Sequence, residues 1–89
     1  MRKIIYPGTF DPIHNGHIDI ANRASKLFDS LEFVVAVNSE KMPLFSIEER
    51  IQMIKDSIKG LENIKVGSFN GLVVEHAVEI QACAIIRGL

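Results

Sequence analysis

Residues 7–17 read PGTFDPIHNGH, and this stretch decides how the chain is interpreted. It follows the short apolar run Ile4-Ile5-Tyr6 and leads into a segment whose apolar residues recur every three or four positions. The pattern predicts a strand, a tight turn and the start of a helix. The first N–H groups of a helix are unpaired, and its N-terminus carries a partial positive charge. With His14 and His17 beside it, the junction is expected to bind a phosphate.

The rest of the sequence alternates between strand and helix signals. Ser46-Ile47-Glu48-Glu49 is a capping box that begins a helix, and Gly60 is expected to end that helix. Strands are expected at residues 3–6, 31–37, 63–69 and 84–86, and helices from 16 to about 29, from 46 to 60 and from 72 to about 81.

The resulting order, β-α-β-α-β-α-β, predicts an α/β fold with a Rossmann-like parallel sheet and flanking helices. Residues 1–89 are expected to form a single domain. Ligands of such sheets bind beyond the carboxyl ends of the strands, near the point where the strand order reverses. The segments expected at that edge are 7–17, 38–45, 69–73 and 87–89.

Composition excludes several classes of partner. The formal net charge is −1, and no basic cluster is present that would neutralise a run of nucleic-acid phosphates. Apolar residues make up 47% of the chain, yet no run reaches membrane-spanning length. The short apolar start does not resemble a signal peptide, so a cytoplasmic location is expected, without nucleic-acid or membrane partners.

The residues of the junction have different expected roles. Thr9 supplies a hydroxyl and an N–H at a strand end. His14 is either an exposed helix cap or a ligand, whereas His17, in the first helical turn, is expected to bind an anion rather than only pack on the sheet. Asp11, beside Pro12 in a turn, is expected to accept hydrogen bonds from nearby backbone N–H groups rather than bind a metal.

Other polar residues are expected to be structural. Residues 48–50 (Glu-Glu-Arg) lie on the capped helix and are interpreted as structural or as subunit contacts. Glu75, His76 and Glu79 are expected on a solvated helix face. Cys83, within a small and apolar run, is expected to be a buried structural thiol.

Four motifs together resemble phosphopantetheine adenylyltransferase, a bacterial family of H-x-G-H nucleotidyltransferases. They are YPGTFDP at 6–12, NGHIDI at 15–20, FSIEER at 45–50 and RGL at 87–89. The resemblance covers residues 4–89. It implies transfer of AMP from ATP to 4′-phosphopantetheine, giving dephospho-coenzyme A and pyrophosphate with the help of Mg²⁺. This is the penultimate step of coenzyme A synthesis, and the family assembles as homohexamers.

The resemblance also implies roles for eight residues. Those that would contact ATP are Thr9, Phe10, His17, Gly88 and Leu89, and those that would bind the acceptor are Thr9, Lys41, Val73 and Arg87. Catalysis would rest on His17 and Lys41, which stabilise charge on the α-phosphate. No residue is assigned as a metal ligand, and His14 stands where many members carry threonine.

The family's chains are longer, and the motif with which they grip the triphosphate would follow Leu89. The fold is therefore expected to lack the C-terminal part of the family fold. Two alternatives stay open: a related H-x-G-H cytidylyltransferase or mononucleotide adenylyltransferase, and a non-catalytic fragment if the chain truly ends at Leu89.

Overall fold

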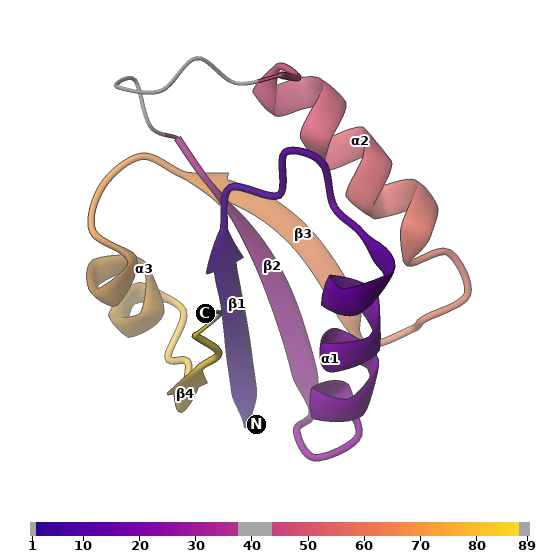
Figure 1. Ribbon diagram of the computed structural model, residues 1–89. Coiled ribbons are helices and arrows are strands. Elements are labelled where there is room, and N and C mark those ends of the chain that lie inside the picture. Colours follow the sequence, from indigo (N-terminus) through magenta and orange to yellow (C-terminus); the bar gives the residue numbers. More distant parts are fainter. Residues whose placement is uncertain (1, 38–43, 88–89) are drawn as a thin grey trace.

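Four parallel strands form one sheet in the order β3-β2-β1-β4 (Figure 1). The computed structural model describes residues 2–37 and 44–87. Its elements are β1 (Lys3–Gly8), α1 (Asn15–Ser25), β2 (Ser30–Ala36), α2 (Ile47–Ser57), β3 (Ile64–Phe69), α3 (Val73–Glu79) and β4 (Ala84–Ile85). The predicted α/β class, a Rossmann-like parallel sheet with flanking helices, is confirmed.

Helices cover both faces of the sheet, with α1 and α2 on one side and α3 on the other (Figure 1). Because successive side chains of a strand point to opposite faces, β1 contributes to two cores. Ile4 and Tyr6 pack in the larger core beneath α1 and α2, and Ile5 packs in the smaller core beneath α3. The sheet is therefore the middle of three layers.

β2 lies inside the sheet, between β1 and β3, and is buried on both faces. Phe33 and Val35 point into the larger core and Val34 into the smaller one, and all three are fully buried. The almost continuous apolar run at 31–37 accounts for this burial, since a strand covered on both faces needs apolar side chains on both.

β1 is two residues longer than predicted, since it includes Pro7 and Gly8. The Ile5 carbonyl accepts a hydrogen bond from Ile86 N–H of the β4 side, so Pro7, two residues on, also faces that side. β4 has only two residues and ends level with Ile5, so no residue of β4 pairs with Pro7. Proline therefore fits at this position, because its missing N–H costs the sheet no hydrogen bond.

α1 ends at Ser25, about four residues earlier than predicted. After Lys26 the chain turns, and the N–H groups of Asp29 and Ser30 both donate to the Arg2 carbonyl, which starts β2 beside β1. Leu27 follows the apolar spacing of the helix, yet it lies beyond the helix end and is 69% exposed. The periodic pattern continues past the helix because Phe28 still packs against the core from the turn.

The order of the strands reverses at β1. From β1 the chain moves outward through β2 to β3, and α3 then returns it to the opposite side of β1, where β4 pairs with Ile4 and Ile5. The carboxyl end of β1 is therefore the place where a ligand crevice is expected.

Candidate functional site

An open pocket of about 410 Å³ lies at this reversal point, between the end of β1 and the start of α1. Its lining residues are Tyr6, Pro7, Gly8, Thr9, Phe10, Asp11, Pro12 and His17. The first turn of α1 contains no acidic residue that would offset the positive end of the helix dipole. Asp11, the carboxylate in the lining, is bound by the N–H groups of Leu44 and Phe45. The pocket thus lies at the strand–turn–helix junction where the sequence predicts a phosphate site.

His14 is the N-cap of α1. Its Nδ1 accepts a hydrogen bond from Gly16 N–H at 3.0 Å, and its ring is stacked on that of His17 with the centroids 3.7 Å apart. His14 does not line the pocket. The cap interpretation, one of the two left open by the sequence, is therefore the one that the structure supports.

His17 occupies the third position of α1 and completes a capping box with His14. Its Nδ1 accepts a hydrogen bond from His14 N–H at 3.1 Å, so the neutral ring carries its proton on Nε2. Burial and, to a smaller extent, the charge of His14 lower the pKa of His17 below its ordinary value. His17 is thus held mainly as a neutral imidazole with one N–H left to donate.

Phe10 combines a buried ring with a backbone that lines the pocket. The ring is 3% exposed and meets those of Tyr6, His17 and Phe33 edge-on at centroid distances of 5.3, 5.0 and 5.2 Å. Its φ of 47° lies in the left-handed region, which costs about 1–3 kcal/mol for a residue of this kind. Packing of the ring offsets this cost and anchors Phe10 beside the exposed Thr9.

Asp11 binds backbone N–H groups, as predicted, but not nearby ones. Its two carboxylate oxygens accept from Leu44 N–H at 2.6 Å and from Phe45 N–H at 2.9 Å. These donors are 33 and 34 residues away in sequence, so the expectation of a local turn contact was wrong. Asp11 instead joins the β1–α1 turn to the segment that precedes α2.

Arg50 lies beside the pocket, and the sequence left two interpretations open, a structural role or a subunit contact. It is 5% exposed, and its Nη1 donates to the Thr9 carbonyl at 2.9 Å. The sequence already indicated that Arg50 is buried, because its position lies on the same face of α2 as Ile47, Ile51 and Ile54. A structural role is confirmed, since the side chain is buried within this chain.

The remaining predicted site residues are not part of the pocket lining. Val73 begins α3 and packs, half-buried, against the smaller core. Arg87 is exposed and follows β4, whose Ile85 pairs with Ile5, so it lies at the same edge of the sheet as the pocket. Lys41, Gly88 and Leu89 lie outside the described residues.

Two predictions about other polar residues were wrong. Cys83 is exposed in the connection between α3 and β4, and its Sγ donates to the Lys3 carbonyl at 3.2 Å. His76 is not solvated: its Nε2 lies 2.8 Å from Glu32 Oε1 of β2, and its ring lies 4.7 Å from that of Phe69. The burial of α3 against the sheet turns this histidine inward.

Within residues 2–37 and 44–87, no group of three or more His, Cys, Asp or Glu side chains is arranged to hold a metal ion. No helix in the same part of the chain is long and apolar enough to cross a membrane.

Comparisons with known proteins identify the family of this chain. A sequence model of the cytidylyltransferase-like family matches residues 5–89. The chain is 52% identical over all 89 residues to phosphopantetheine adenylyltransferase of Caldanaerobacter subterraneus subsp. tengcongensis and 53% identical to that of Desulfitobacterium hafniense (strain DSM 10664 / DCB-2). It spans 56% and 55% of those two proteins, about half of their length.

Two solved structures share the fold. The lipopolysaccharide core biosynthesis protein from Thermoplasma volcanium GSS1 superposes with a TM-score of 0.72 at 27% identity, over 96% of this chain and 72% of the other. The NadR protein in complex with NAD and AMP-PNP also gives 0.72, at 22% identity, over 93% of this chain and 28% of that one.

Proposed function

Because this chain belongs to the cytidylyltransferase-like family, we propose that it carries the N-terminal part of a phosphopantetheine adenylyltransferase. The reaction would transfer AMP from ATP to 4′-phosphopantetheine and give dephospho-coenzyme A and pyrophosphate, in coenzyme A synthesis. The observation that carries the proposal is the orientation of His17. Its Nδ1 accepts a hydrogen bond at the helix N-terminus, so its Nε2–H is left to donate to an anion in the pocket.

The chemistry requires little covalent help from the protein. A phosphate oxygen of the acceptor forms a bond to the α-phosphorus of ATP, while the bond from that phosphorus to the bridging oxygen of pyrophosphate breaks and the electron pair leaves with pyrophosphate. Since the nucleophile is already charged, no activated serine or cysteine is needed. Positioning and stabilisation of the charged transition state are what the site must supply.

The described residues suit that task. Nε2–H of His17 would donate to an oxygen of the α-phosphate, next to the positive end of α1. Thr9 would stand between donor and acceptor, and Phe10 would present its backbone to ATP. For Lys41, Val73, Arg87, Gly88 and Leu89, the proposal rests on the resemblance of their motifs.

Magnesium belongs to the proposal as a partner of ATP. Asp11 already uses both carboxylate oxygens on backbone N–H groups, and the described residues offer no carboxylate cluster. This fits Mg²⁺, which commonly retains several waters and binds through substrate phosphates. When bound it would neutralise part of the triphosphate charge. We include a homohexamer and a cytoplasmic location in the proposal on the same resemblance.

The activity is tested by pyrophosphate release on the protein that carries this sequence, with Mg²⁺, phosphopantetheine and either ATP or CTP. Turnover is expected with ATP. Turnover with CTP but not with ATP would instead assign a cytidylyltransferase, one of the alternatives that the sequence leaves open. No turnover with either nucleotide would reject the proposal.

Calorimetry of the 89-residue chain with the same nucleotides tests the fragment alternative. ATP binding without turnover by this chain would indicate that the part described here binds the donor but does not complete the reaction.

A further inference from the structure

Arg50 is a charged side chain on the buried stripe of α2. It is 5% exposed, and its guanidinium donates in two directions: Nη1 to the Thr9 carbonyl at 2.9 Å and Nε to the Ser46 carbonyl at 3.4 Å. Ser46 caps the helix, and its side chain is already used in the capping box with Glu49. The guanidinium therefore ties the start of α2 to the turn that follows β1.

The bond to Thr9 fixes the orientation of a peptide at the pocket. A trans peptide is planar, and its C=O and the following N–H point in opposite directions. With the Thr9 carbonyl directed at Arg50, the N–H of Phe10 is directed away from α2. Both residues line the pocket, and in the described part of the chain no acceptor pairs with that N–H.

The same peptide is held from its other end by the Phe10 ring. The ring is buried between Tyr6 and Phe33, and the φ of 47° is a conformation that an aromatic residue rarely adopts unaided. Ring packing fixes where Phe10 lies, but it leaves the peptide before Phe10 free to rotate. The bond from Arg50 removes that freedom.

We propose that Arg50 is a positioning residue for the phosphate donor. By holding the Thr9 carbonyl, it keeps Phe10 N–H directed into the pocket, where this N–H donates to a phosphate oxygen of ATP. Arg50 itself touches no reacting atom. The inference rests on the proposed function, because it takes ATP as the ligand of the pocket.

Arg50→Met tests the role, because methionine fits a buried apolar stripe and replaces the aliphatic part of the arginine side chain but cannot donate to Thr9. NMR titration of the ¹⁵N-labelled chain with ATP and Mg²⁺ measures the dissociation constant and the Phe10 amide shift together. The variant is expected to bind ATP roughly tenfold more weakly and to lose the Phe10 shift. Adenosine, which has no phosphate, should bind both proteins equally, a result that general loosening of the fold would not give.

Arg23→Met is the matched control. It removes the same charge from an exposed arginine of α1 that pairs with Asp19, and ATP affinity should stay at the wild-type value. Should Arg50→Met fail to fold, Arg50→Leu, which is also apolar and has no donor for the Thr9 carbonyl, takes its place with the same expected results.

Equal ATP affinity and an unchanged Phe10 shift in the folded variant would overturn the positioning role and leave the proposed function standing. Absence of any ATP-induced shift in the wild-type protein would overturn the proposed function, and the positioning role with it.

Discussion

At the scale of single residues, the two nitrogens of His17 have separate tasks: Nδ1 completes the cap of α1, and Nε2 remains for the ligand. Glutamine is a favoured residue at this third helical position and accepts the same backbone N–H. His17→Gln should therefore have the same urea midpoint of unfolding as the wild type, but its kcat for AMP transfer should be about 10²-fold lower.

His17→Ala is the companion variant, since it removes the cap acceptor as well. It should show the same loss of kcat together with a lower urea midpoint. A His17→Gln protein with wild-type kcat would leave His17 a purely structural residue.

The lowered pKa of His17 makes stability depend on pH. As the pH falls through the ordinary histidine value of 6.5, the unfolded chain takes up this proton before the folded one does. The contribution of His17 to the free energy of unfolding is thus intact above that pH and decreases as the pH falls towards the lower folded pKa. Urea unfolding at about pH 7.5 and about pH 5.5 should show a larger loss for the wild type than for His17→Gln.

The same measurement contains its own check. His76 is unchanged in the variant and lies on α3, on the other face of the sheet, so its contribution cancels in the comparison. Equal losses in the two proteins would contradict a lowered pKa at His17.

At the scale of elements, α2 has a buried stripe, a strong N-cap and an exposed outer face. Ser46 Oγ accepts from Glu49 N–H at 3.1 Å, and Glu49 Oε1 accepts from Ser46 N–H at 3.0 Å. Ser46→Ala should lower the free energy of unfolding by about 1 kcal/mol, because it leaves an N-terminal N–H of the helix without its acceptor. Urea denaturation measures the change.

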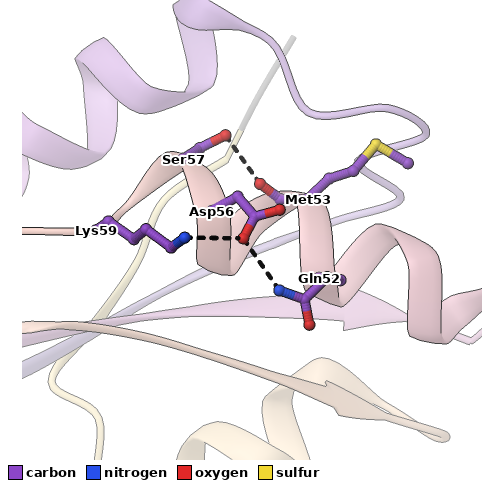
Figure 2. A network of polar contacts seen from close by, with 5 residues as sticks. All are labelled: Gln52, Met53, Asp56, Ser57 and Lys59. Atoms are coloured by element: carbon purple, nitrogen blue, oxygen red, sulfur yellow. Dashed lines mark hydrogen bonds and ion pairs between the residues drawn. The ribbon is translucent and has the colours of Figure 1, made fainter.

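Ser57→Ala is the matched control on the same helix. Figure 2 shows Ser57 donating to the Met53 carbonyl, at 2.9 Å, beside the contacts of Asp56 with Gln52 and Lys59. These groups are exposed, so the change should stay within about 0.5 kcal/mol. Equal effects of the two alanine substitutions would mean that the cap contributes nothing beyond an ordinary exposed serine.

At the scale of the whole molecule, Asp11 joins segments more than thirty residues apart. Asp11→Asn keeps one good acceptor but removes the charge and the second acceptor, so one of the N–H groups of Leu44 and Phe45 loses its partner. The free energy of unfolding should fall by about 1–3 kcal/mol. Amide hydrogen exchange at Phe45 should accelerate.

Asp19→Asn provides the comparison. It breaks only the exposed pair with Arg23 on α1, so its effect should remain below about 0.5 kcal/mol. If Asp11→Asn were equally mild, the link between the β1–α1 turn and the start of α2 would not stabilise the fold.

The sequence by itself determined the strand and helix order, the N-cap of α2, the apolar run of the central strand β2 and the strand–turn–helix junction that carries His17. Gly60 was expected to end α2, but the helix ends earlier, at Ser57. These features depend on local periodicity and on residues close together in the chain, so the pattern is enough to predict them. The same pattern placed the end of α1 about four residues too late, because apolar spacing continues into a turn that still contacts the core.

Only the tertiary structure decided the partners of Asp11, the burial of Arg50, the pairing of His76 with Glu32 and the exposure of Cys83. Each of these contacts or exposures depends on which elements the fold brings together, between 33 and 80 residues apart in the chain. Spacing along a sequence shows which side of a helix or strand a residue lies on. It does not show which carbonyl, carboxylate or ring lies opposite, because that is set by how the layers pack.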